Sequence, residues 1–100
     1  MAYDLATLPR KRLAALCRRH GIRRLAVFGS ALREDFGEAS DVDVLVEFES
    51  EVRVGLAFFR IEEELTRLLG CRVDLNTPGF LGRRIRDRVL AEARDVYVAA

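Results

Sequence analysis

Asp41 and Asp43 stand one residue apart at the start of an apolar run, ten residues after the pair Gly29-Ser30. In a strand, side chains two residues apart project to the same face, with Cα atoms about 7 Å apart. Two such carboxylates could hold a pair of cations about 3.5 to 4 Å apart. Hard oxygen ligands suit Mg²⁺ or Mn²⁺. The aspartate pair alone is a weak signal, because 16 of the 100 residues are acidic.

Asp74 supplies a third carboxylate, within the short apolar run Val73-Asp74-Leu75. A carboxylate among apolar neighbours needs a cation or hydrogen-bond donors to offset its desolvation. If its strand lies beside that of Asp41, three carboxylates converge, and a metal would relieve their repulsion. The alternative is that Asp74 pairs with an arginine of the last predicted helix, and the sequence leaves both interpretations open.

Gly29-Ser30 could bind the anion that complements such a metal site. Glycine allows close approach of the backbone to a phosphate, following amides can point at it, and the serine hydroxyl adds a donor. Arg33, one turn later, could reach the same anion. As a bare dipeptide, however, Gly-Ser is an ordinary turn.

Hydrophobic spacing predicts the elements that must position these residues. The first helix has Pro9 for its first turn and Gly21 for its stop, and the last helix follows Thr77-Pro78, an N-cap and a first-turn proline. The predicted elements are, in order, a helix over 8–20, a strand over 24–28, one or two helical turns over 31–36, a strand over 41–48, a helix over 55–69, a strand over 71–76, a helix over 79–94 and a short edge strand over 96–99.

The faces of these elements follow from the same spacing. On the second strand, the core face has Val42, Val44, Val46 and Phe48, and the other face has Asp41, Asp43, Leu45 and Glu47. The acids at 62–64 are expected on a largely solvated helix side. The apolar stripe of the last helix would consist of Leu81, Ile85, Val89 and Ala93. This order predicts an α/β (α+β) fold with helices packed on a small mixed β-sheet.

Length and composition restrict the class of protein. A chain of 100 residues, half apolar and one-third charged, is expected to form a single domain over residues 1–100. No apolar run approaches a membrane span and the start lacks a secretory signal, so we expect a cytoplasmic protein without membrane contact. Cys17 and Cys71 are expected to be buried reduced thiols, and His20 a cation near a helix end rather than a catalytic group.

Charge is segregated along the chain. Residues 1–33 have eight Lys or Arg against one acid, whereas residues 34–64 have eleven acids against two Arg. Such segregation favours a charged ligand or partner, although solvated helix faces of different sign would give the same pattern. The basic residues lack the interleaved aromatics of a nucleic-acid-binding surface, so direct binding of nucleic acid is not expected.

The combination of these motifs is more specific than any part. The pattern of apolar strand, Gly-Ser, ten residues, Ser-Asp-Val-Asp, apolar strand and a later Val-Asp-Leu strand resembles the nucleotidyltransferase superfamily of the DNA polymerase β-like enzymes. More narrowly, GSALRED and SDVDVLVEF resemble the minimal nucleotidyltransferases (MNT or MntA type), which act as antitoxins beside HEPN-domain toxins. The resemblance covers about residues 22–78 and implies the polymerase β palm-like fold.

The resemblance also implies roles for individual residues. Gly29 and Ser30 would bind the β- and γ-phosphates of ATP, and Asp41 and Asp43 would hold two Mg²⁺ ions. Asp74 would complete the catalytic metal site and help to deprotonate the acceptor hydroxyl. Arg33 matches an arginine of the family's Gly-Ser-x-Ala-Arg-Gly pattern, but Leu32 replaces its alanine and Glu34 its second glycine.

The size of the chain leaves no room for the acceptor-binding domains of larger members of the superfamily. The acceptor would therefore come from a partner, and the resemblance implies transfer of AMP from ATP to a tyrosine of a HEPN-type toxin. The alternative function is a non-catalytic antitoxin that neutralises its partner by binding alone. The basic first helix and the arginine-bearing last helix are both candidate surfaces for that partner.

Overall fold

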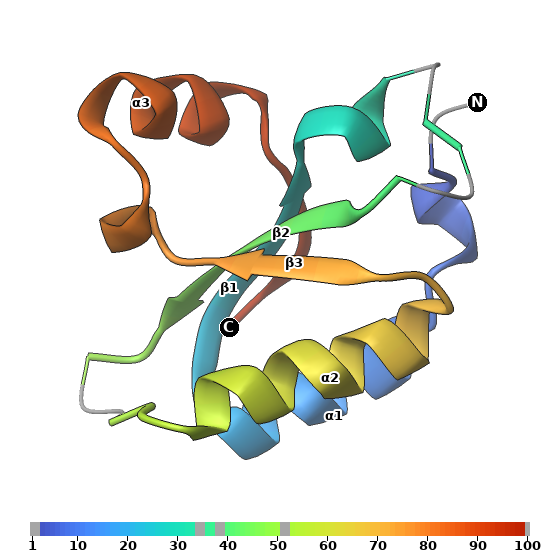
Figure 1. The fold of residues 1–100 in the computed structure, drawn as a ribbon. Coiled ribbons are helices and arrows are strands. Elements are labelled where there is room, and N and C mark those ends of the chain that lie inside the picture. Colours follow the sequence, from blue (N-terminus) through green and yellow to red (C-terminus); the bar gives the residue numbers. More distant parts are fainter. Residues whose placement is uncertain (1–2, 34–35, 38–39, 51–52, 100) are drawn as a thin grey trace.

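The sheet of the computed structural model holds the candidate site residues on neighbouring strands. The structure describes residues 3–33, 36–37, 40–50 and 53–99. In these ranges four strands form a mixed sheet of spatial order β3-β2-β1-β4 (Figure 1). β1 is antiparallel to both β2 and β4, and β2 is parallel to β3. The strands are β1 Ile22–Phe28, β2 Val42–Phe48, β3 Val73–Asn76 and β4 Arg94–Val98.

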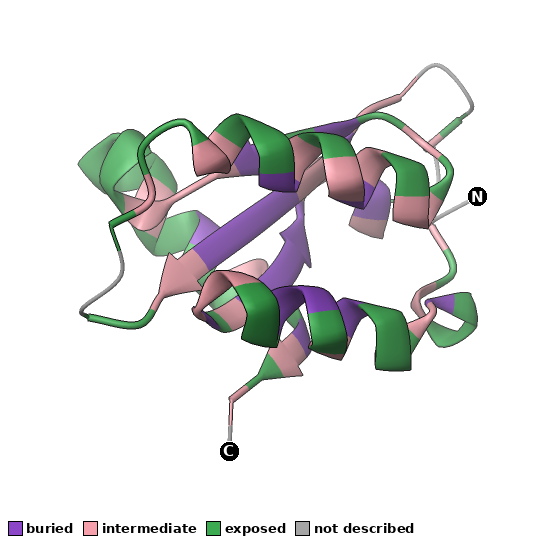
Figure 2. Cartoon of the chain, turned by 90° about the horizontal axis from the view of Figure 1, so that it is seen from below, coloured by how far each residue is buried: buried purple, intermediate pink, exposed green. Residues whose placement is uncertain are grey.

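Helices cover both faces of this sheet. The helices α1 (Arg10–His20) and α2 (Ala57–Leu69) lie side by side on one face, and α3 (Arg83–Glu92) lies on the other (Figure 1). Figure 2 shows the buried residues on the sheet and on the helix sides that face it, with exposed residues outside. The predicted fold class is confirmed, because apolar stripes of helices close both faces of a mixed sheet.

The core face of β2 is the predicted valine face. Val42, Val44 and Val46 pack with apolar residues of α1 and α2 in the larger hydrophobic cluster. Leu45, predicted on the opposite face, is also buried, because Val89 of α3 packs with it in a second cluster. A helix therefore covers part of the aspartate-bearing face, next to the candidate site.

The last helix differs from its prediction. Thr77 makes no side-chain cap, and Pro78–Phe80 form a separate 3₁₀ turn before α3 begins at Arg83. Glycine has a low helix propensity, and Gly79 and Gly82 flank an extended Leu81, so the helix cannot run through this segment. Ile85, predicted on the apolar stripe, is 59% exposed, whereas Val89, one turn later, is buried.

Other element boundaries agree within a few residues. The helix stop at Gly21 is confirmed, with a left-handed φ of 67°. The predicted strand over 24–28 begins two residues earlier, and the edge strand over 96–99 is Arg94–Val98. The turns predicted over 31–36 instead begin at Gly29 and end at Leu32. Residues 34 and 35 lie outside the described residues.

Two side chains of α2 bind the free edge of β3. The Thr66 hydroxyl accepts a hydrogen bond from the Val73 amide at 3.1 Å, and the Glu62 carboxylate accepts one from the Leu75 amide at 2.9 Å. An edge strand otherwise presents such N–H groups to solvent or to another chain. The prediction of a solvated side for residues 62–64 was therefore wrong for Glu62, which helps to hold the strand of Asp74 in place.

Replacing Glu62 by alanine is expected to destabilise the protein by about 1 to 2 kcal/mol, because the Leu75 N–H loses its partner. Urea unfolding of the parent and the variant would measure this change. Glu63→Ala is the matched control, since the Glu63 side chain is 63% exposed and its ion pair with Arg67 lies within α2. Equal urea concentrations at the midpoint of unfolding for Glu62→Ala and Glu63→Ala would contradict a structural role of Glu62.

Glu64 of α2 pairs with two side chains at the end of α1. His20 lies 3.4 Å from Glu64, which also binds Arg19, so His20 has a carboxylate partner on α2.

Cys17 is buried, and burial raises the pKa of its thiol to about 12. Cys71 is half-buried, not fully buried as predicted, and both cysteines are free thiols.

Among the described residues, no helix has the length and apolarity needed to cross a membrane.

Candidate active site

The parallel pairing of β2 and β3 brings two of the predicted site residues together. Asp43 is the register partner of Asp74, and the flanking pairs Val42 with Val73 and Val44 with Leu75 are buried on the opposite face. Register partners in neighbouring strands lie about 4.8 Å apart and project to the same face. The two carboxylates therefore stand side by side on the face of the sheet that α3 partly covers.

Asp43 is the most perturbed acid of this group. Partial burial raises the pKa of its carboxyl above the ordinary value, and the nearby charges of Asp74 and Asp41 raise it further. A hydrogen bond from the backbone amide of Ser30 opposes this shift. Like charges held close together disfavour ionisation, and a bound cation removes that penalty.

Asp41 lies directly before β2 rather than inside it, because the strand begins at Val42. Its backbone carbonyl accepts a hydrogen bond from the Ser30 hydroxyl at 3.3 Å. The Gly-Ser turn is thereby tied to the start of β2. Both predicted halves of the site, the turn and the carboxylates, meet at this point.

Gly29 must be glycine for two reasons. Its φ of 70° lies in the left-handed region, which a side chain disfavours. In addition, a Cβ at this position would overlap the carboxylate of Asp43. The backbone of the turn therefore lies directly against the aspartate, at the end of β1.

Glu92 is a residue of this region that the sequence analysis did not identify. Its carboxylate accepts a hydrogen bond from the Gly29 amide at 3.2 Å, across 63 residues of sequence. Glu92 is the last residue of α3, where negative charge opposes the helix dipole. An acid at a predicted helix C-terminus was the only signal for it in the sequence.

The environment of Asp74 differs from its prediction. Asp74 is exposed and lies on β3, the edge strand of the sheet. Its apolar neighbours Val73 and Leu75 point to the other face, so desolvation is not what constrains Asp74. The ion pairs of the described residues include none between Asp74 and an arginine of α3.

Arg33 ends the Gly-Ser turn with a hydrogen bond from its amide to the carbonyl of Ser30 at 3.0 Å. The residue is exposed. Glu34, which replaces the glycine of the family pattern, lies outside the described residues. The position of Arg33 next to the turn is established, whereas its predicted contact with an anion stays a prediction.

The donor set fits hard divalent cations. The three aspartates offer carboxylate oxygens, the ligands that Mg²⁺ and Mn²⁺ prefer, and their mutual repulsion is the kind that a cation relieves. Within the described residues, however, no three or more Asp, Glu, His or Cys side chains lie close enough together to hold a metal ion by themselves. Phosphate oxygens or water would have to supply the remaining ligands.

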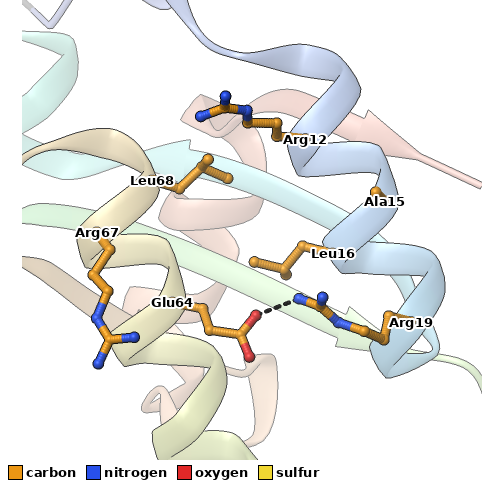
Figure 3. A pocket seen from close by; sticks show the side chains of 7 residues that line it. All are labelled: Arg12, Ala15, Leu16, Arg19, Glu64, Arg67 and Leu68. Atoms are coloured by element: carbon orange, nitrogen blue, oxygen red, sulfur yellow. Dashed lines mark hydrogen bonds and ion pairs between the residues drawn. The ribbon is translucent and has the colours of Figure 1, made fainter.

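A groove of about 440 Å³ lies away from these carboxylates. It runs between α1 and α2, with Leu16 and Leu68 on its two sides and Glu64 bonded to Arg19 across it (Figure 3). These helices cover the opposite face of the sheet from Asp43. The groove is therefore not part of the candidate active site, although Arg12 and Arg67 add to its basic character.

Comparison with known proteins places the chain in a family. The model of the nucleotidyltransferase domain family matches residues 10–96. The protein adenylyltransferase MntA of Thermococcus cleftensis is 48% identical over 80 residues, which are 80% of this chain and 78% of MntA. All three aspartates and the Gly-Ser turn lie within the range that the family model matches.

Solved structures agree with this match. A protein assigned as a minimal nucleotidyltransferase superimposes with a TM-score of 0.75 at 43% identity, covering 91% of this chain and 94% of that one. The MNT antitoxin structure with a tri-AMPylated HEPN toxin of Shewanella oneidensis superimposes with a TM-score of 0.62, over 90% of this chain and 70% of that one. At 17% identity, the second likeness shows the fold alone.

Proposed function

Because this chain belongs to the nucleotidyltransferase domain family, we propose that it transfers AMP from ATP to a hydroxyl group of a protein partner. The observation that carries this proposal is the register of Asp43 with Asp74 directly beside the Gly29-Ser30 turn. A site for a metal-bound triphosphate requires carboxylates to hold the metal and a backbone turn that can approach the phosphates closely. The similarity to a protein adenylyltransferase supports AMP as the transferred group.

The proposed roles follow from the position of each residue. Asp41 and Asp43 hold two Mg²⁺ ions, or Mn²⁺, and Asp74 completes the site of one of them. Bound there, the ions would neutralise charge on the departing pyrophosphate and favour attack on the α-phosphate. Gly29 and Ser30 bind the β- and γ-phosphates through backbone amides and the serine hydroxyl, and Arg33 contacts the same anion.

Asp74 has a second proposed role. It is exposed at the edge of the sheet, whereas Asp43 is partly covered and held by the Ser30 amide. An acceptor hydroxyl can approach from the open side and transfer its proton to the Asp74 carboxylate. Asp43 then acts on the phosphate side and Asp74 on the acceptor side of the same reaction.

The proposed acceptor is a tyrosine of a HEPN-domain toxin, and the reaction would make this protein a cytoplasmic antitoxin. The similarity to an MNT antitoxin, whose HEPN toxin is AMPylated, supports this partner. Two basic surfaces are available to it, the groove between α1 and α2 and the exposed arginines of α3. The groove lies on the opposite face from the carboxylates, so a partner that presents a tyrosine must also contact the α3 face.

The test combines this protein, Mg²⁺, ATP labelled at the α-phosphate and a HEPN-domain protein from the same genome. We expect label on the HEPN protein, at a tyrosine located by mass spectrometry, and none when EDTA removes the metal. ATP labelled at the γ-phosphate is the control, because AMP transfer leaves that label on pyrophosphate. Binding of ATP without transfer to the HEPN protein would contradict the proposed function.

A further inference from the structure

A backbone amide of the Gly29-Ser30 turn donates to a carboxylate of the chain itself. The Gly29 amide donates to Glu92 at 3.2 Å, and the carboxylate of Asp43 lies against the same turn. A carboxylate and a phosphate can each accept a hydrogen bond from an N–H group, because each has negatively charged oxygen atoms. The turn therefore already binds an anion in the absence of a nucleotide.

The two carboxylates differ in how firmly they are held. Asp43 extends from the middle of the sheet, between β1 and β3. Glu92 is the last residue of α3, and its long side chain reaches the turn from above the sheet. Val89, one turn earlier, packs with Phe28 and Leu45 and so directs this end of α3 towards Gly29. Of the two carboxylates, Glu92 is the one that can move away without disturbing the sheet.

We propose that Glu92 is an internal anion that occupies the phosphate position at the Gly29 amide, and that a nucleoside triphosphate must displace it in order to bind. The inference rests on the proposed function, because it assigns the turn to phosphate. Glu92 acts through Gly29, so it is a positioning residue that sets nucleotide affinity.

Two substitutions separate the charge of Glu92 from its hydrogen bond. Glu92→Gln keeps an oxygen acceptor for the Gly29 amide but removes the negative charge that opposes a phosphate. Glu92→Ala removes both and leaves the amide free. Asp87→Asn is the matched control, because Asp87 is an exposed acid of the same helix and its replacement changes the net charge equally.

The experiment measures binding of ATP with Mg²⁺, and separately of inorganic tripolyphosphate, by calorimetry. For both Glu92 variants we expect Kd to fall about tenfold, the scale of one charge-assisted hydrogen bond. Asp87→Asn should leave Kd unchanged. In AMP transfer, KM for ATP should fall with Kd while kcat stays within about twofold, since displacement of Glu92 affects binding rather than chemistry.

Unchanged Kd in both Glu92 variants would overturn the inference. A rise in Kd together with a lower Tm would also overturn it, because Glu92 would then only link α3 to the turn. Failure of the proposed function gives a different result. If the parent binds ATP but transfers no AMP, the proposed function is wrong, and the Kd values for ATP still test the role of Glu92. If the parent binds no ATP, both proposals are wrong.

Discussion

Replacing both Asp41 and Asp43 by asparagine is expected to lower the rate of AMP transfer by at least about a thousandfold, because asparagine cannot neutralise and align two divalent cations. The protein should remain folded. Partial burial and the charges of Asp74 and Asp41 raise the pKa of Asp43, which means that the folded state disfavours its charge. Removing that charge should therefore leave Tm unchanged or raise it.

The measurement is single-turnover transfer of labelled AMP, with Tm determined on the same samples. Asp87→Asn together with Glu63→Gln is the control for the loss of two negative charges elsewhere on the surface, since both side chains are exposed. A double aspartate variant that transfers AMP at the parental rate would exclude these residues as metal ligands. A variant that transfers none but still neutralises the toxin would favour the alternative function, neutralisation by binding alone.

Gly29→Ala is expected to cause the second large effect, on both stability and nucleotide binding. The left-handed backbone of Gly29 costs about 1 to 2 kcal/mol for a residue with a Cβ. A Cβ would also force the end of the Asp43 side chain to move, which adds a smaller cost. Displacing Asp43 should also weaken binding of ATP with Mg²⁺ by at least about tenfold.

Gly70→Ala provides the control for this variant. Gly70 has a φ of 71°, nearly equal to the 70° of Gly29, but a Cβ there meets no atom within 4 Å. Urea unfolding should therefore show the backbone cost alone for Gly70→Ala and the larger total for Gly29→Ala. Equal losses of stability and unchanged ATP affinity in both variants would contradict the close contact between Gly29 and Asp43.

Strong local patterns made most of the fold predictable. The alternating valines of residues 42–46 and the helix stop at Gly21 depend on neighbours in sequence, and both are confirmed. The last helix was predicted four residues too early, because glycines at 79 and 82 outweighed the Thr77-Pro78 start pattern. The burial of Leu45 could not be predicted, since it depends on Val89 from a helix 44 residues later.

The candidate site, like the fold, was predictable only where it depends on residue types and short spacings. Residue types and spacing identified the three aspartates, Gly29, Ser30 and Arg33 as candidates without any structure. The desolvation argument for Asp74 was wrong, because a sequence does not reveal which strand lies at the edge of a sheet. Glu92 was not identified, because its partner, the Gly29 amide, is a backbone group 63 residues away.

By itself, then, the sequence determined the chemical groups of this protein and the local elements that carry them. Side-chain chemistry and short-range backbone preferences are properties of neighbouring residues. Only the tertiary structure decided that Asp74 stands beside Asp43, that Gly29 lies against Asp43 and that Glu92 binds the Gly29 amide. Each of these contacts depends on strand register or helix packing, which the free energy of the whole chain sets.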